Sequence, residues 1–569
     1  MTTPTSPVGT RALLALAAVA VGFAAVDTYV VVLALPDMMV AVDIDVEQLQ
    51  RAAPIVSGFL LGYVAVLPLV GRVADLRGPV PVLLASLVVL AVGSAVTAAS
   101  YDLVTMVLGR FVQGVGGGGL VPATMTLVAA LYPVERRGLP LGLVSAVQEL
   151  GSVLGPLAGA AVLAFGSWRS IFGLTCAGGL LLWAAVRVQA RSEVPPREGR
   201  PDLLGAALVV VAVGATYLLL APPRSLYTDL TWGELFIPLV DDGSRWTQPV
   251  GLVAVAAAAA FALRCLLARR PLVDVRSWGR TLVEADLAGA AWLAVALGGV
   301  VLAFASADPE QSAISPQAPW FLLGSAVAVV GLVRHLRRAA SPLVPRGTLA
   351  PRPAWGALVV SLLVGWALIA ALVDIPLFAR TAERDYDQLD AALVLVRFLL
   401  ALPVGAVVGG LLVRRLPAGA VTAGGMLAAS GAFWWMAQWD QGSLDSTLST
   451  LPLVLGGLGF GLALAPVNAA MLASTRDDAH GLASALVVVA RMIGMLVGIS
   501  VLTTYGLARL YDERRADPSL GLRELGLLQE RAVFEGAALV ALVAAVAAVA
   551  LFRGAATRGV DTREALRVG

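Results

Sequence analysis

The run GLPLGLVSAVQELGSVLGPLAGAAVLAF, residues 138–165, decides the class of fold to which this chain belongs. Its 28 residues include a single ionisable side chain, Glu149. Apolar runs of about 18 residues or more are typical of transmembrane helices, because such a helix crosses the hydrocarbon core of a bilayer. The run therefore predicts a membrane span that carries a carboxylate near its middle.

Similar runs recur along the whole chain of 569 residues, of which 59% are hydrophobic and 14% are charged, against about a quarter charged in an average soluble protein. A soluble protein with buried helices would show runs of only about 10 to 14 residues. The net charge of +2 gives no indication of nucleic-acid binding. The sixteen expected spans are 13–38, 52–76, 79–99, 103–130, 138–165, 168–187, 203–222, 249–268, 281–305, 318–336, 354–379, 390–414, 419–437, 450–474, 481–507 and 531–553.

The arginines indicate the orientation of these spans. If the N-terminus lies inside and the spans alternate, the inner loops hold roughly twice as many arginines as the outer loops, as the positive-inside rule requires. The first run is too long for a signal-peptide core, so we interpret it as a retained span. We expect a multi-pass protein of the inner (plasma) membrane with both termini in the cytoplasm. If the pair of spans within 281–336 is not transmembrane, fourteen remain and this orientation is unchanged.

The order of the spans predicts an all-α polytopic membrane protein built from two six-helix bundles with extra linker transmembrane helices. We expect an N-terminal bundle over 1–190, a linker with about four transmembrane helices over 191–350, and a C-terminal bundle over 351–569. A faint repeat supports two halves, because GLVSA at Gly142 and GLASA at Gly481 each open a fifth span. Parallel halves around a site in the middle of the membrane are a transporter architecture.

Two outer segments have patterns of their own. In 223–248, the pair Asp242-Gly243 predicts the turn of a small hairpin. Around 481–553 the helical pattern continues beyond the apolar runs, and each helix of about 35 residues would be roughly 50 Å long. We expect these last two helices to project outward together, and a disordered loop is the alternative.

Ionisable side chains inside spans are costly and usually face a partner or a water-filled cavity. Asp27 and Arg110 lie at matching depths in the first half, which predicts that they pair. Glu149 and Arg491 lie at equal depths, roughly 16 Å from the inner end, one in each half. We expect a pair that protonation of Glu149 releases, with Arg397 as a third cationic candidate. The alternative is that these pairs only stabilise helix packing.

Weaker polar signals and a glycine pattern accompany the charges. Gln113, Gln148 and Asn468 are candidate polar side chains of a cavity, although amides often only bridge helices. Gly151, Gly155 and Gly159 line one face of a helix, and Pro156 favours a bend. Two cysteines are too few for a disulfide framework or a cysteine metal cluster, and His335 and His480, which we place in loops, do not predict a metal site.

Three motifs resemble those of the major facilitator superfamily. GSVLGPLAGA at Gly151 looks like its antiporter motif, and LGRFVQGVGGG at Leu108 looks like its fourth-span motif. GRVADLRGPV at Gly71 resembles its loop motif and keeps Gly71, Asp75 and Gly78, whereas Leu76, Pro79 and Val80 replace basic residues that are usual there. The resemblance implies two six-helix bundles and transport, with the charge-relay role of the loop left open.

Longer stretches resemble the drug:proton antiporter branch, and within it a mycobacterial group that exports triacylglycerides or drugs with a periplasmic lipoprotein. They are VDTYVVV at Val26, AVQELGSVLGPL at Ala146 and HGLASALVVVARMIGML at His480. The resemblance implies that Asp27 couples protons and that Glu149 and Arg491 form a functional pair. That branch has two extra spans between its halves, and the likeness of RPLVDVRSWGR and SPLVPRGTLAPR predicts a duplicated linker hairpin here.

We therefore expect proton-coupled export of a hydrophobic cargo, with lipid such as triacylglyceride favoured and a multidrug/proton antiporter without a lipid role as the alternative. A lipid-modifying membrane enzyme would need a reactive constellation that the sequence does not offer. A receptor or scaffold has no need for buried acid–base pairs. We expect a monomer that uses the proton gradient and no cofactor, with a periplasmic lipoprotein as a further candidate partner.

Overall fold

The computed structural model describes residues 7–42, 44, 49–132, 137–190, 202–220, 222, 224–227, 229, 231–239, 245–268, 271–305, 317–339, 341–345, 347–382, 388–476 and 479–554. Within these ranges every regular element is a helix and no strand occurs. The apolar runs form helices because a helix satisfies its own backbone hydrogen bonds without water. Sixteen of the described helices have 18 residues or more.

The helices fall into three consecutive groups. The first comprises α1 (Pro7–Val40), α2 (Leu49–Arg77), α3 (Pro79–Ala98), α4 (Leu103–Leu131), α5 (Gly138–Phe165) and α6 (Trp168–Gln189). The linker holds α7 (Leu203–Leu220), α8 (Arg224–Tyr227), η3 (Gly233–Phe236), η4 (Arg245–Thr247), α9 (Pro249–Leu267), α10 (Val275–Glu284), α11 (Leu287–Ala305) and α12 (Ala318–Arg338). The last comprises α13 (Arg352–Ala382), α14 (Gln388–Leu412), α15 (Ala418–Met436), η5 (Ser443–Asp445), η6 (Thr447–Ser449), α16 (Thr450–Ala473), α17 (His480–Ala516) and α18 (Leu522–Leu551).

The first and last groups pack in the same pattern. α1 packs on α5, α2 on α4, and α3 on α4 and α6; correspondingly, α13 packs on α17, α14 on α16, and α15 on α16 and α18. Between the groups, α5 lies against α14 and α2 against α17. The molecule is therefore built from two six-helix halves that meet through equivalent pairs of helices.

The sixteen long helices follow the sixteen expected spans in order. Twelve of the described helices are long and apolar enough to cross a membrane by length and composition, and a thirteenth results if the bent pair α10 and α11 is one span. Among the described residues, α5 and α7 contain shorter apolar helical segments, Leu139–Gln148 and Leu203–Leu219. The chain is a multi-pass membrane protein, and crossing by all sixteen helices stays a prediction.

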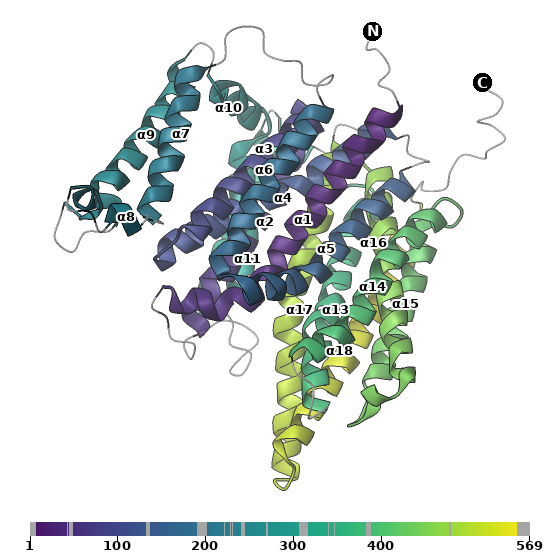
Figure 1. Cartoon of the computed structure of the whole chain (residues 1–569). Helices are drawn as coiled ribbons and strands as arrows, with labels where there is room; N and C mark the ends of the chain where they lie inside the picture. Colours follow the sequence, from purple (N-terminus) through teal and green to yellow (C-terminus); the bar gives the residue numbers. More distant parts are fainter. Residues whose placement is uncertain are drawn as a thin grey trace, which may run out of the picture.

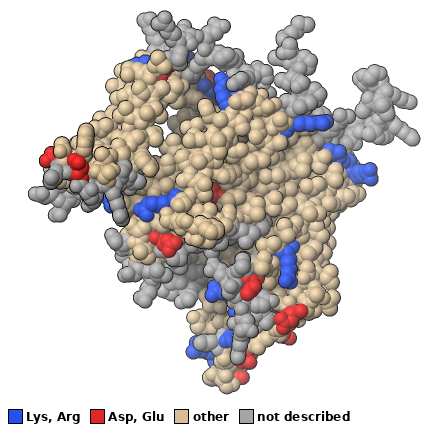
Figure 2. Space-filling model, viewed as in Figure 1, with Lys and Arg blue, Asp and Glu red and all other residues tan. Residues whose placement is uncertain are grey.

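α1 begins and α18 ends at the same end of the molecule, and α17 and α18 extend beyond the other helices at the opposite end (Figure 1). We call these the termini end and the far end. α17 has 37 residues and α18 has 30, so both are long helices and the disordered-loop alternative is wrong. Their projection to the outer side of the membrane stays a prediction. The face in Figure 2 shows a broad band with few charged side chains between the two ends, as a lipid-facing surface requires.

The linker contains two helical hairpins, α7–α9 and α11–α12. In the first, Asp202 precedes α7 and accepts hydrogen bonds from the backbone N–H of Gly205 (3.0 Å), Nε of Arg264 (2.7 Å) and the N–H of Leu272 (3.0 Å). The Arg264 side chain and the Gly205 N–H lower the pKa of Asp202 below its ordinary value. One carboxylate thus joins the start of α7, the end of α9 and the following segment.

The second hairpin repeats this arrangement. Asp286 accepts from the N–H of Gly289 (2.9 Å) and of Leu343 (2.8 Å), and Nε2 of His335 lies 2.6 Å from its Oδ1. In both hairpins, one aspartate thus contacts the start of the first helix, the second helix and the segment that follows it. This common arrangement supports the expected duplication. α11 also packs against α2 and α17, so this copy covers the junction between the two halves.

Three expectations for the linker and its surroundings change. The expected span 281–305 starts too early. The chain bends by 72° between α10 and α11, where Asp286 has φ +65°, so the straight helix begins only with α11. His335 and His480 lie on α12 and α17 and not in loops. The expected turn at Asp242-Gly243 lies outside the described residues; its flanks include η3 and η4 and share one backbone hydrogen bond, from Leu239 N to Thr247 O (3.2 Å).

Candidate functional site: buried charges and the cavity between the halves

Asp27 lies in the interior of the first half with 1% of its surface exposed. It comes from α1, whose apolar run packs against α5, so nothing but protein surrounds the carboxylate. Nη1 of Arg110, on α4, lies 3.6 Å from Oδ2 of Asp27. The predicted contact between these two side chains is therefore present in the structure.

Gln113 completes this contact. Its Oε1 accepts a hydrogen bond from Nη1 of Arg110 (2.8 Å), and its Nε2 donates to Oδ1 of Asp27 (2.7 Å) and to Oγ of Ser94 (3.0 Å). Thr175 on α6 also donates to Oδ1 of Asp27 (3.1 Å). Gln113 thus lies inside the first half as a bridge, whereas the sequence suggested a side chain lining a cavity.

Aromatic rings and a carbonyl oxygen hold the Arg110 guanidinium. Its carbon lies 4.4 Å from the ring centre of Phe59 and 5.7 Å from that of Phe172, and Nε donates to the carbonyl oxygen of Ile55 (3.4 Å). A guanidinium over aromatic faces is stabilised electrostatically, and more so when water is excluded. Arg110 is therefore held by groups of α2 and α6 in addition to Asp27.

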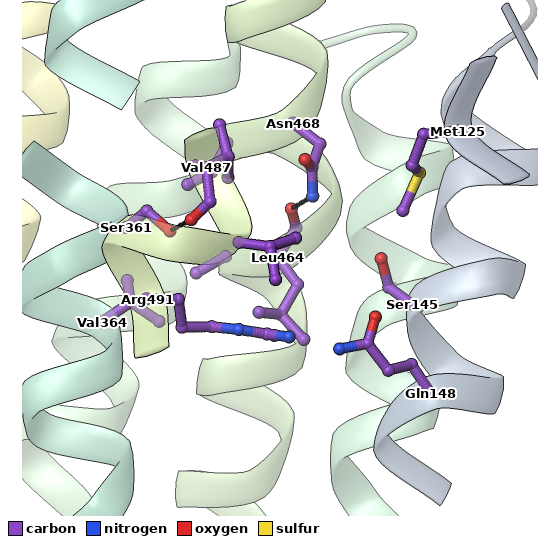
Figure 3. Close-up of a pocket in the computed structure, with 12 residues that line it drawn as sticks. Met125, Ser145, Gln148, Ser361, Val364, Leu464, Asn468, Val487 and Arg491 are labelled. Carbon is purple, nitrogen blue, oxygen red and sulfur yellow. Dashed lines mark hydrogen bonds between the residues drawn. The ribbon is translucent and has the colours of Figure 1, made fainter. Parts of the chain in front are cut away.

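A second polar region lies between the two halves. A small cavity of about 20 Å³ is lined from the first half by Met125, Ser145 and Gln148, and from the second by nine residues of α13, α16 and α17. Figure 3 shows Arg491 extending from α17 toward Gln148 on α5. Oδ1 of Asn468, buried in this wall, has no hydrogen-bond partner among the described groups. The cavity therefore offers a cation and amides within mostly apolar walls.

The proposed pair of Glu149 and Arg491 is only partly described. The side chain of Glu149 lies outside the described residues, although its backbone belongs to α5 next to Gln148. Arg491 is 8% exposed and lines the cavity. Arg397, the third candidate, is half-buried on α14 and donates to Oγ1 of Thr450 at the start of α16 (3.3 Å). It joins two helices of one half, and the pair with Glu149 stays a prediction.

The glycine face of α5 lies against α1. A Cβ added at Gly151 would collide with the carbonyl oxygen of Gly22, and one at Gly159 would come 2.9 Å from Cγ2 of Val30. Gly155 is buried on the same helix; the side chain of Pro156 is outside the described residues, and the helix continues through its backbone. The helix that carries Asp27 thus packs closely against the helix that carries Gln148 and Glu149.

The loop motif closes the termini end between the halves. Asp75, at the end of α2, accepts hydrogen bonds from the backbone N–H groups of Gly481 (2.8 Å) and Leu482 (3.3 Å). These are orphan donors at the start of α17, whose own N-cap residue is an alanine without a capping side chain. Gly71 and Gly481 also approach too closely for a Cβ on either. Gly78 has φ +91° and starts α3, a backbone conformation that favours glycine.

The sequence reasoning missed a buried acid pair in the second half. Asp374 on α13 and Glu530 on α18 are 5% and 2% exposed, and their carboxyl groups lie within reach of each other. Asp374 gave the same signal as Asp27, a carboxylate within a long apolar run. Glu530 gave no such signal, because it precedes the expected last span and lies in a segment rich in charged residues.

Comparisons with known proteins place this geometry in a family. The model of the Major Facilitator Superfamily matches residues 17–334 and 313–499. The chain belongs to the major facilitator superfamily. A solved structure of the human organic anion transporter MFSD10 covers 96% of this chain and all of its own, with a TM-score of 0.56 at 12% identity, which shows the shared fold.

Curated relatives cover most of the chain. A triacylglyceride transporter of Mycobacteroides abscessus is 35% identical over 503 residues, 87% of this chain and 82% of its own. One of Mycolicibacterium hassiacum is 34% identical over 501 residues, 86% and 78% of the two chains. One of Mycobacterium tuberculosis strain H37Rv is 33% identical over 545 residues, 93% and 89%. Family membership indicates a transporter.

Proposed function

We propose that this protein exports a lipid of the triacylglyceride class across or out of the inner membrane, coupled to proton movement, by alternating access. The relatives that cover most of the chain are named triacylglyceride transporters, which supports the cargo. The observation that carries the mechanism is the buried network of Asp27, Gln113 and Arg110.

Protonation of Asp27 removes the negative charge that balances Arg110. The uncompensated guanidinium then favours a conformation in which α1 and α4 give it another partner or water, since a lone buried charge is costly. α1 moves with α5 because their backbones touch at Gly22 and Gly151. α5 in turn lines the cavity between the halves through Ser145 and Gln148. A proton at Asp27 thereby changes the walls that meet the cargo.

The closed termini end defines the state from which this cycle starts. Asp75 and the Gly71–Gly481 approach hold α2 against α17, so access from that side requires these contacts to break. We assign the termini end to the cytoplasm, in line with the arginine-rich loops. The far end, with the projecting α17 and α18, then faces away from the cell interior and guides lipid out. The transporter acts as a monomer without a cofactor besides the proton gradient, and a periplasmic lipoprotein is a candidate to receive its cargo.

The test uses purified protein in liposomes with fluorescent triacylglyceride or ethidium and an imposed pH gradient. Asp27→Asn is expected to lower gradient-driven transport at least tenfold, because an amide cannot exchange a proton. Asp37→Asn is the matched control, since Asp37 is an exposed aspartate on the same helix. Glu149→Gln is expected to lose transport as well.

The outcomes separate the alternatives. Transport of lipid that depends on the gradient and on Asp27 supports the proposal. Transport of ethidium without lipid would replace it with a multidrug antiporter. Unchanged transport by Asp27→Asn would show that the carboxylate only stabilises the first half and would overturn the proton mechanism.

A further inference from the structure

The buried acid pair of the second half is not used by the mechanism above. Asp374 and Glu530 come from α13 and α18, the first and last helices of that half, and their carboxyl groups touch. Two carboxylates in contact and away from water repel strongly, so a buried pair of this kind holds at least one proton between them.

The other titratable groups on the surrounding helices have partners of their own or lie at the surface. On α18, Arg531 pairs with Asp440 and donates to the carbonyl oxygen of Trp439 (2.6 Å), and Arg523 donates to that of Thr381 (2.8 Å). The remaining ionisable groups described on α13, α14, η5, α17 and α18 toward the far end are Arg380, Asp390, Arg397, Asp445, Tyr505, Arg509, Tyr511, Asp512, Glu513, Arg514, Arg515, Glu524 and Glu535.

One oxygen of the pair indicates where the proton belongs. Oε2 of Glu530 is buried and has no hydrogen-bond partner among the described residues. Oε1 has only a long contact, 3.5 Å, from Nε2 of Gln529. A buried acceptor without a donor is unfavourable, because it has lost its hydrogen bonds to water. A proton on either acid supplies the missing donor and removes one negative charge, which no other described group does.

Glu530 lies close to the far end of α18. It is the ninth residue of that helix, whereas the termini end is about twenty residues further along it. The next residue, Arg531, pairs with Asp440, whose side chain is 73% exposed. Along α18 the surface of the far end is therefore nearer to Glu530 than the surface of the termini end.

We propose that Asp374 and Glu530 form a second proton-binding site, which takes up one proton from the far end and shares it between the two carboxyl groups. The proton adds to one carboxylate oxygen and is hydrogen-bonded by the other; no other bond forms or breaks. Its loss leaves two negative charges that push α13 away from α18. The inference rests on the proposed proton coupling for its role in transport, and its test needs no cargo.

The first measurement is thermal stability in detergent as a function of pH. The wild-type protein is expected to lose stability at alkaline pH, where the shared proton dissociates. Asp374→Asn and Glu530→Gln are expected to remove most of that alkaline loss, because neither variant can carry two adjacent charges. Glu535→Gln is the matched control, with the same change on the same helix, and is expected to keep the wild-type alkaline loss.

The second measurement is infrared spectroscopy at neutral pH, which detects the C=O stretch of protonated carboxylic acids. Subtracting the spectrum of the double variant Asp374→Asn/Glu530→Gln from that of wild type is expected to reveal one such band, which shifts in D₂O. The same subtraction with Glu535→Gln is expected to show none. A flat difference for the double variant would mean that no proton resides on the pair and would overturn the proposal.

Salt distinguishes a proton from a metal cation. The alkaline loss is expected to be equal in sodium chloride and choline chloride at the same ionic strength. Protection by sodium alone would identify a cation site and overturn the assignment to a proton. Because these results do not involve transport, they stand apart from the outcome for Asp27→Asn in liposomes.

Discussion

The two halves of this transporter bury an aspartate at nearly the same place and balance its charge differently. Asp27 is the 21st residue of α1 and Asp374 the 23rd of α13, each after a valine. Thr175, the eighth residue of α6, contacts Asp27, and Glu530, the ninth of α18, contacts Asp374. The first half thus offers a hydroxyl where the second offers a second acid.

The counter-charge accounts for the rest of the difference. Arg110 is the eighth residue of α4, and the eighth residue of α16 is Gly457. A Cβ at Gly457 would collide with the carbonyl oxygen of Phe398 on α14, so no arginine fits at that place. Two copies of one packing pattern therefore stabilise a buried acid in two ways, one with a fixed cation and the other, in our proposal, with a mobile proton.

The largest loss of stability is expected when the fixed cation of the first half is removed. Arg110→Leu leaves Asp27 buried without a counter-charge, which is expected to cost about 3–5 kcal/mol of stability. Adding Asp27→Asn is expected to restore most of the loss, because no charge is then left. Thermal unfolding in detergent measures both, and a single variant as stable as wild type would contradict the assigned balance.

Removing the bridge is expected to have the next largest effect. Gln113→Leu deletes hydrogen bonds to both charged groups, which are worth about 1.5–3 kcal/mol when one partner is charged. The ion pair at 3.6 Å remains, so the loss is expected to be smaller than for Arg110→Leu. The same unfolding experiment tests this order, and a larger loss for Gln113→Leu would reverse our ranking of bridge and cation.

In the second half, the close packing of α14 on α16 at Gly457 can be tested in the same way. Gly457→Ala is expected to destabilise by about 1–3 kcal/mol, since α14 and α16 must separate to admit the methyl group. Gly424→Ala is the control, because a Cβ there meets nothing within 4 Å and alanine favours a helix. Equal stability of the two variants would show that sterics do not keep an arginine out of this half.

The smallest loss of stability is expected when the hydroxyl group of Thr175 is removed. Thr175→Val keeps the shape of the side chain and removes one hydrogen bond to Asp27, at a cost of about 0.5–1.5 kcal/mol. Thr28→Val is a suitable control, because Thr28 donates only within its own helix, to the carbonyl oxygen of Ala24 (2.9 Å). If both threonine variants lose the same stability, the bond to Asp27 contributes nothing.

Much of the architecture follows from the sequence because membrane helices are dictated by local composition. A long apolar run has no alternative to a helix in lipid, so the order of the helices and the length of the last two were predictable. Depth along a helix rises by a fixed 1.5 Å per residue, so the contact of Asp27 with Arg110 was predictable as well.

Other features depend on which helix faces come together, and composition does not state that. Glu530 lies in a segment as charged as the exposed loop beside it, and only the packing of α18 on α13 buries it against Asp374. The bend at Asp286 arises because its carboxylate is held by groups from two distant places in the chain. The sequence by itself determined the helices and the depth of each charge; the tertiary structure decided the partner of each charge, since electrostatic energy depends on distances in space and not along the chain.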